Sequence, residues 1–261
     1  MKFVHTEIQS TFNDFGFRVE LTGDGSPTLR MLKSSNEKYE NGESMHHSQG
    51  AYTETEYIYG TCIREALAKS CRQFIVVGLG LGYIELLIVR ELVANGISNA
   101  SILSFESVDL LRQSFVRWAN HSPLDPEIEN TYNKVADYLA TESIPAADLR
   151  RAASTMLETA FLKLMPSLEE PFGFSRDQIK LREGTCILYD AFSKATDSQL
   201  WEEEFLVTFL QTHSGYPSFL STYACTGNLK RALKRTGYQV EEKPGFSGKR
   251  LSIMARLETL T

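Results

Sequence analysis

The stretch Phe74–Gly82, which reads FIVVGLGLG, joins an apolar run to a glycine-rich turn and opens a helical pattern over 83–94. Glycine lets the backbone turn sharply and approach a ligand, and a helix start offers unpaired N–H groups. A second apolar run, Ile102–Phe105, ends on Glu106. A carboxylate at the tip of the next strand can accept hydrogen bonds from a ribose diol. The pattern therefore predicts a nucleotide-binding βαβ unit.

The spacing of the glycines distinguishes between classes of nucleotide-binding turn. The dinucleotide fingerprint G-x-G-x-x-G would need a third glycine at position 83, where this chain has Tyr83. The observed G-x-G-x-G, formed by Gly78, Gly80 and Gly82, resembles the first motif of Rossmann-like methyltransferases. Their cofactor, S-adenosylmethionine, has no pyrophosphate. The turn thus argues against an NAD-dependent dehydrogenase.

Composition narrows the class of protein further. The chain has 261 residues with 42% apolar content, which suits one α/β domain with additions or two small domains. It contains no apolar run near the roughly 18 residues of a membrane span and no signal-peptide core. Four cysteines without a C-x-x-C pair favour a reduced, cytoplasmic protein and argue against structural zinc. A net charge of −6 excludes nucleic-acid binding through bulk charge but not through a local basic patch.

The remaining sequence completes an α/β pattern. Residues 1–53 read as a β-rich extension with loops, and residues 54–261 as a Rossmann-like class I methyltransferase domain with a helical insertion at about 107–180. Apolar periodicity and turn residues predict the remaining elements of that domain. These are helices over 54–69, 199–210 and 228–235, with Asn228 as a cap, strands over 186–189 and 219–223, and a hairpin of 238–241 with 251–255.

Several chemically useful residues fall at predicted strand ends. The glycine turn follows one strand, Glu106 the second and Asp190 a third. In open α/β sheets, ligands bind outside the carboxyl ends of the strands. We expect these three features to converge there. Adjacent histidines at 46–47 point apart on most backbones and lack suitably spaced partners, so no metal site is predicted.

Longer motifs carry a resemblance to a known family. They occur in the order Asp24–Thr28, His46–Thr55, Asp190–Ser193 with Leu200-Trp201, and Gly227–Leu233 with Pro244–Arg250. This series, spanning roughly residues 17–255, resembles the methyltransferase part of the MnmC family. The family converts the 5-aminomethyl-2-thiouridine at the tRNA wobble position to its methylaminomethyl form, using S-adenosylmethionine. The resemblance implies a stand-alone form without the family's flavin-dependent oxidase domain, and the anticodon loop of tRNA as the partner.

The resemblance also implies roles for residues around the cofactor. Gly78, Gly80 and Gly82 would lie beside its methionine end, and Glu106 would hold the ribose hydroxyls. Glu54 would approach the cofactor from the N-terminal side. Residues 161–166 lack the acidic residue that related chains place before the catalytic strand, so the resemblance assigns no adenine contact.

On the substrate side, the resemblance implies that Asp190 is the catalytic residue, facing the methyl group and the incoming amine. It also implies that Phe192 and the loop with Lys249 and Arg250 lie near the nucleotide. Because the base must leave the anticodon stack, we expect an aromatic side chain such as Phe192 or Phe246 to stack on it. Lys230 and Arg231 belong to a basic helix that, with Lys249 and Arg250, forms the densest basic region of an acidic chain. We expect this region to contact phosphates.

Two alternatives remain at this stage. The first is an aminopropyltransferase of the spermidine-synthase type, which has a similar fold and uses a decarboxylated form of the same cofactor. The second is a non-catalytic Rossmann-like binding module. The basic C-terminal loop argues against the first, and the retention of the glycines, Glu106 and Asp190 argues against the second. The sequence specifies no oligomeric state.

Overall fold

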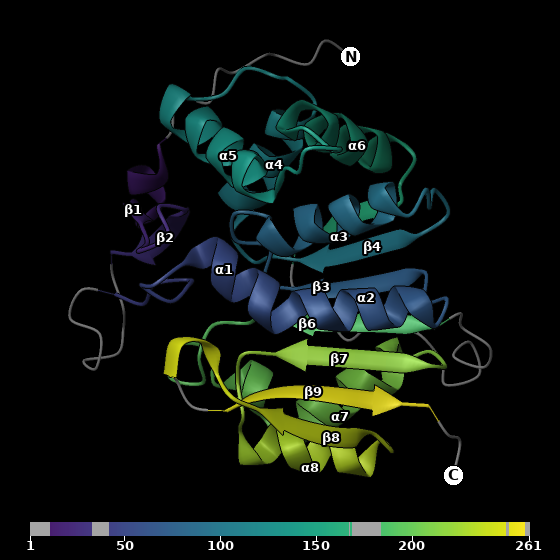
Figure 1. Ribbon diagram of the computed structural model, residues 1–261. Coiled ribbons are helices and arrows are strands. Elements are labelled where there is room, and N and C mark those ends of the chain that lie inside the picture. The colour runs from purple at the N-terminus through teal and green to yellow at the C-terminus, as the bar shows by residue number, and fades with distance from the viewer. Residues whose placement is uncertain (1–10, 33–41, 167, 169–183, 249–250, 259–261) are drawn as a thin grey trace, which may run out of the picture.

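A seven-stranded sheet forms the centre of the chain (Figure 1). The computed structural model describes residues 11–32, 42–166, 168, 184–248 and 251–258. Within them, the strand order of this sheet is β5-β4-β3-β6-β7-β9-β8. The strands are β3 (Gln73–Val77), β4 (Ser101–Phe105), β5 (Leu162–Met165), β6 (Thr185–Tyr189), β7 (Ser218–Thr222), β8 (Gln239–Lys243) and β9 (Ser252–Leu257).

The pairing of the strands locates the ligand crevice. β3 pairs in parallel with β4 on one side and with β6 on the other. β9 is antiparallel to both of its neighbours, β7 and β8. The chain crosses to the other side of β3 between β5 and β6, so the strand order reverses next to β3. Ligands bind in open α/β sheets at this kind of switch point, outside the carboxyl ends of the strands.

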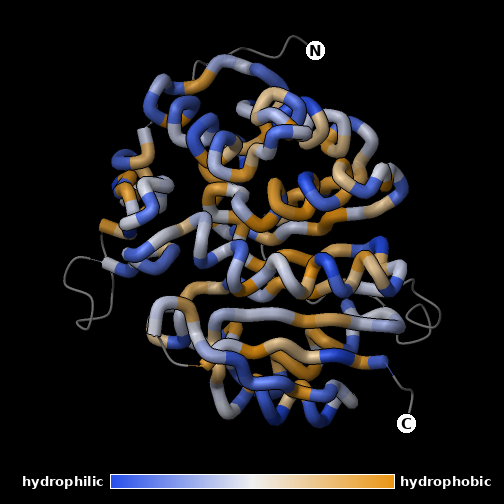
Figure 2. Tube along the Cα trace, in the orientation of Figure 1, coloured by the Kyte–Doolittle hydropathy of each residue, from blue (hydrophilic) through white to orange (hydrophobic). Residues whose placement is uncertain are grey.

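Alternating residues of the strands build two cores, one on each face of the sheet. Phe74 and Val76 of β3 pack on one side, with helices α2 (Thr61–Ala68) and α3 (Tyr83–Ala94). Ile75 and Val77 pack on the other side, with α7 (Glu203–His213) and α8 (Gly227–Arg235). Figure 2 shows apolar stretches along the strands and polar residues on the outer helices. This burial on both faces explains why the predicted strands read as continuous apolar runs.

Three helices extend the core beyond α3 (Figure 1). They are α4 (Asp109–Ala119), α5 (Pro126–Leu139) and α6 (Ala146–Glu158). Trp118 of α4 stacks on Tyr132 of α5, with ring centroids 5.7 Å apart, and both side chains are fully buried. The region predicted as a helical insertion therefore begins with helices, but it also supplies β5, which pairs with β4.

The N-terminal extension forms a second, two-stranded sheet of β1 (Phe17–Leu21) and β2 (Pro27–Met31), preceded by a short 3-10 helix, η1 (Phe12–Phe15). Hydrogen bonds from two tyrosine hydroxyls attach this hairpin to the main domain. The Tyr83 hydroxyl donates to the Pro27 carbonyl oxygen at 2.8 Å, and the Tyr138 hydroxyl donates to the Asp24 carbonyl oxygen at 2.8 Å. The residue that breaks the dinucleotide fingerprint thus holds the extension in place.

Three details differ from the sequence prediction. The helix expected over 54–69 begins earlier and comprises α1 (Ala51–Thr55), a π-helical turn η3 (Glu56–Gly60) and α2. The helix expected over 199–210 is split into η5 (Gln199–Trp201) and α7, because Glu202 is extended. Asn228 is not a cap: Thr226 caps α8, its hydroxyl accepting from the Leu229 N–H.

Gly82 tests the link between the glycine turn and the helical region. Its φ is +75°, and a Cβ atom there would lie 2.4 Å from the Phe115 ring. Gly96 has a φ of +63°, and a Cβ atom there would have nothing within 4 Å. We expect Gly96→Ala to lose about 1–2 kcal/mol of unfolding free energy through backbone strain alone. Gly82→Ala should lose about 1–3 kcal/mol more through the ring contact, measured by urea denaturation. Equal losses would contradict tight packing at Phe115.

Candidate cofactor pocket and active site

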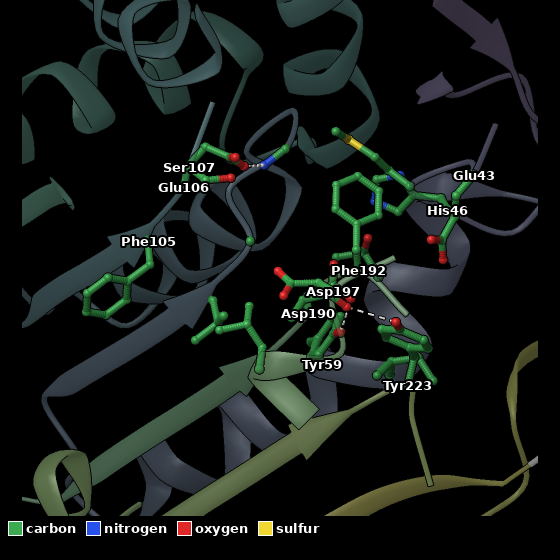
Figure 3. A pocket seen from close by; sticks show the side chains of 18 of the residues that line it. Glu43, His46, Tyr59, Phe105, Glu106, Ser107, Asp190, Phe192, Asp197 and Tyr223 are labelled. Carbon is green, nitrogen blue, oxygen red and sulfur yellow. Dashed lines mark hydrogen bonds between the residues drawn. The ribbon is translucent and has the colours of Figure 1, made fainter. Parts of the chain in front are cut away.

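A pocket opens at the carboxyl ends of β3, β4 and β6 (Figure 3). The segments that line it are the glycine turn, the residues after β4 and β6, the helix α1 with η3, and the end of the N-terminal extension. The polar side chains in its lining are those of Glu43, Ser44, His46, Glu54, Thr55, Tyr59, Glu106, Ser107, Asp190, Asp197 and Tyr223. The predicted convergence of strand-end residues is thus present in the fold.

The glycine turn forms one wall of the pocket. Gly78 has a φ of +95°, and a Cβ atom there would lie 2.6 Å from the Asp190 carbonyl oxygen. Gly80 has a φ of +50°, and its N–H donates to Oε2 of Glu106 at 3.1 Å. A side chain at position 78 would therefore collide with the loop that carries Asp190. The two glycines leave space in which a ligand can reach the backbone.

Glu106 faces the pocket as a buried, held carboxylate. Its second oxygen, Oε1, accepts from the Val108 N–H at 2.9 Å. Burial raises the pKa of Glu106, whereas the hydrogen bonds from the backbone of Val108 and Gly80 act to lower it. Two backbone donors fix the orientation of the carboxylate, so its acceptor lone pairs are preorganised toward the pocket.

Asp190 follows β6 and lies next to two tyrosines that the sequence analysis does not single out (Figure 3). The Tyr59 hydroxyl donates to Oδ1 of Asp190 at 2.5 Å. The Tyr223 hydroxyl donates to the carbonyl oxygen of Ala191 at 2.8 Å. In the sequence, Tyr59 reads as one more apolar position of the helix. The sequence predicts Tyr223 as the last residue of a strand, whereas in the structure β7 ends one residue earlier, at Thr222.

The N-terminal extension closes the pocket on the side opposite the sheet. Glu43 accepts from the backbone N–H of Ser193 at 3.3 Å and from its hydroxyl at 3.1 Å. His46 Nδ1 bonds to the Thr28 hydroxyl at 2.9 Å. Glu54, predicted to approach the cofactor, is buried, lines the pocket and accepts from the His47 N–H at 2.5 Å. The extension is therefore part of the site.

Some predicted site residues lie elsewhere. Phe192 lines the pocket. Gly82 does not line it and instead lies against the ring of Phe115. Phe246 also lies outside the lining, against the ring of His47 at 5.6 Å between centroids. Lys249 and Arg250 fall outside the described residues.

The basic helix α8 is paired with acidic side chains. Lys230 Nζ lies 2.9 Å from Glu242, and Arg231 Nε lies 2.5 Å from Glu203. Arg235 pairs with Glu203 and Glu204. Glu203 and Glu204 begin α7 and form ion pairs with Arg231 and Arg235 of α8. Neither Lys230 nor Arg231 lines the pocket.

Two features are absent from the described part of the chain. No group of three or more His, Cys, Asp or Glu side chains there is arranged to hold a metal ion. No helix among the same residues is long and apolar enough to cross a membrane.

Comparison with known proteins agrees with this geometry. Residues 175–258 match the family described as S-adenosyl-L-methionine-dependent methyltransferase. The chain is 33% identical over 88 residues to the "tRNA 5-methylaminomethyl-2-thiouridine biosynthesis bifunctional protein MnmC" of Azoarcus sp. (strain BH72), covering 33% of this chain and 14% of that protein. It is 26% identical over 176 residues to the protein of the same name from Idiomarina loihiensis, covering 66% and 28%. The chain thus spans less than a third of these curated relatives.

A solved structure establishes the fold. MNMC2 from Aquifex aeolicus superposes with a TM-score of 0.58 at 22% identity, covering 92% of this chain and 70% of that one. The matched family is that of S-adenosyl-L-methionine-dependent methyltransferases, and the curated relatives that the chain resembles are MnmC proteins. The class I fold of the chain, predicted from the sequence, is confirmed. The cofactor of this class is S-adenosylmethionine, and the glycine wall and Glu106 of this chain are suited to it.

Glu106 provides a direct test of the cofactor pocket. We expect Glu106→Ala to lose about 1–3 kcal/mol of S-adenosylmethionine binding, the scale for hydrogen bonds to a charged group. Isothermal calorimetry measures the loss, and NAD should not bind either protein. Glu242→Ala, which removes a carboxylate outside the pocket lining, is the control and should bind as the wild type. Unchanged affinity in Glu106→Ala would remove Glu106 from the ribose role.

Proposed function

We propose that this chain methylates the nitrogen of the aminomethyl group on the wobble uridine (position 34) of tRNA. The observation that carries the proposal is the placement of Asp190 in the pocket beside the glycine wall, with its carboxylate held by Tyr59. The names of the curated relatives concern biosynthesis of 5-methylaminomethyl-2-thiouridine in tRNA. The cytoplasmic location expected from the cysteines suits a tRNA substrate.

The residues of the pocket fit the cofactor of this class. Gly78 and Gly80 provide a wall without side chains, and a Cβ atom at Gly78 would collide with the Asp190 carbonyl oxygen. Glu106 and Glu54 offer carboxylate oxygens suited to hydroxyl and amino groups. When bound, S-adenosylmethionine supplies an electrophilic methyl group on a positively charged sulfur. We assign Glu106 to the ribose hydroxyls and Glu54 to the cofactor from the side of the extension.

Asp190 acts on the amine of the substrate. An amine attacks only when its lone pair is free, so it must be deprotonated. The carboxylate accepts a hydrogen bond from the amine N–H, which points the lone pair toward the methyl group. It also stabilises the positive charge that develops on nitrogen, and it or water takes the proton that nitrogen loses. Position and charge stabilisation are the main requirements, because the leaving thioether is neutral.

The substrate nucleotide must leave the anticodon stack to reach a recessed pocket, as bases do in other enzymes that act on them. Phe192 lines the pocket and is half-buried, so its ring is placed to stack on the extruded base. Phe246 lies beside His47 and Tyr57, which adjoin the pocket-lining residues His46 and Ile58. We assign Phe246 to a neighbouring part of the same nucleotide. The family match favours methyl transfer over the aminopropyl alternative.

The purified chain tests the function directly. Incubated with S-adenosylmethionine and tRNA bearing the aminomethyl wobble uridine, it should form the methylaminomethyl nucleoside, detected by mass spectrometry of digested tRNA. Asp190→Asn keeps the size of the side chain and removes its charge. We expect turnover to fall roughly 100-fold or more while cofactor affinity stays near the wild-type value, because orientation and charge stabilisation are lost together.

Two outcomes would contradict the proposal. Absence of the methylated nucleoside with active controls would exclude this substrate, and formation of an aminopropyl product from the decarboxylated cofactor would support the aminopropyltransferase alternative. Near-normal turnover in Asp190→Asn would leave Asp190 as a structural strand-end residue only.

We further propose that Lys249 and Arg250, together with Lys230 and Arg231, clamp tRNA phosphates. The double variant Lys249→Ala/Arg250→Ala should bind tRNA more weakly, because two positive charges near the phosphates are removed. The slope of log affinity against log salt concentration should flatten by roughly 0.7–0.9 for each phosphate that is no longer neutralised. Filter binding at several salt concentrations measures both quantities.

The control for this clamp removes the same charge elsewhere. Lys69 and Arg72 precede β3, at the edge of the sheet opposite the pocket. Lys69→Ala/Arg72→Ala should keep the wild-type affinity and slope. If both double variants behave alike, tRNA docks on another surface, and the helical region α4–α6 becomes the first candidate.

A further inference from the structure

The helix that carries Tyr59 is wound irregularly next to the active site. The π-helical turn Glu56–Gly60 separates α1 from α2. Such turns are rare, insert one extra residue into a helix and are frequent at functional sites. Ile58 and Tyr59 of this turn both line the pocket. Glu54 and Thr55 of α1, four positions earlier, line the pocket as well, so Tyr59 lies on the pocket-facing side of this helix.

Contacts from three directions hold the π turn in place. The Ser221 hydroxyl of β7 donates to the carbonyl oxygen of Ile58 at 2.7 Å. Glu56 pairs with Arg64 at 2.7 Å and with Arg90 of α3 at 2.8 Å. Gly60 makes room for this carboxylate, because a Cβ atom there would lie 2.5 Å from Oε1 of Glu56. The position of Tyr59 is thus fixed by the sheet and by α3.

Tyr59 is a neutral hydrogen-bond donor at physiological pH. Its side chain is buried, and burial, followed by the charge of Asp190, raises its pKa well above the ordinary value. A phenol that stays protonated donates a hydrogen bond to the nearest acceptor, which here is Oδ1 of Asp190 at 2.5 Å. A hydrogen bond to the charged form of a carboxylate favours that form.

The surroundings of Asp190 make such a donor useful. The titratable side chains that share the pocket with it come from each packed element, and most are acidic. They are Glu54 and Tyr59 of the helix, Tyr223 after β7, Asp197 beyond β6, Glu106 after β4, and Glu43 and His46 of the extension. Like charges nearby disfavour ionisation of a carboxylate. Donation from a neutral phenol opposes that effect without adding a positive charge next to the cationic methyl donor.

We propose that Tyr59 is a positioning residue for methyl transfer, which orients the Asp190 carboxylate and keeps it ionised. The inference rests on the proposed function for its catalytic consequence, but the Tyr59–Asp190 bond itself is independent of the substrate. Tyr59 touches Asp190 rather than the reacting atoms, so it acts on the amine through that carboxylate. The phenol therefore matters to turnover and not to the affinity of the nucleic acid.

Tyr59→Phe removes the hydroxyl and keeps the ring. The pKa of Asp190, followed by NMR of protein labelled with ¹³C in aspartate carboxyls and assigned with Asp190→Asn, should rise by about one unit. The kcat for methyl transfer should fall about tenfold, the effect of one hydrogen bond to a charged group. KM for tRNA and the Kd of S-adenosylmethionine should stay unchanged.

Tyr238→Phe is the matched control. Tyr238 is also a buried phenol, bonded to the hydroxyls of Ser214 and Ser218 and outside the pocket lining. It should leave the titration of Asp190 and kcat at wild-type values. An unchanged titration in Tyr59→Phe, an equal shift in Tyr238→Phe, or a shifted titration with normal kcat would each overturn the inference. The titration needs no tRNA, so it separates failure of this inference from failure of the proposed substrate.

Discussion

The close approach of two backbones at the ends of β3 and β6 determines the geometry of the whole site. The strands pair in parallel with Val77 opposite Tyr189, and Asp190 N–H donates to the Val77 carbonyl oxygen at 2.8 Å. A Cβ atom at Gly78 would lie only 2.6 Å from the Asp190 carbonyl oxygen. The glycine wall and Asp190, the proposed catalytic residue, therefore share one hydrogen-bonded junction. This junction fixes them relative to each other, as the proposed methyl transfer requires.

Much of this junction could be predicted from the sequence, because it depends on local rules. The helix expected over 83–94 and the strand expected over 101–105 have these bounds in the structure. Parallel neighbours place their carboxyl ends at one edge of a sheet, so the glycine turn, Glu106 and Asp190 were expected to meet, and they line one pocket.

The rest of the site depends on contacts that no local pattern encodes. Tyr59 lies 131 positions before its partner Asp190, and apolar periodicity does not reveal the π turn that carries it. The partners of the basic helix cannot be predicted from composition for a related reason: Lys230 and Arg231 pair with Glu242 and Glu203, which other elements contribute. Side-chain identity gives the charge of a residue, but only the fold gives its partner.

The N-terminal extension connects two walls of the pocket. Glu43 binds Ser193 in the loop after β6, and Met45 approaches Gly80, so the extension bridges the loop that carries Asp190 and the glycine wall. Burial of polar groups beside a pocket lowers the local dielectric constant and strengthens the electrostatic interactions between them. The carboxylate of Asp190 can serve the proposed reaction only if it stays ionised and its oxygen is oriented toward the amine. A neutral phenol meets both needs, because it donates a hydrogen bond without introducing a cation that would repel the sulfonium of the cofactor.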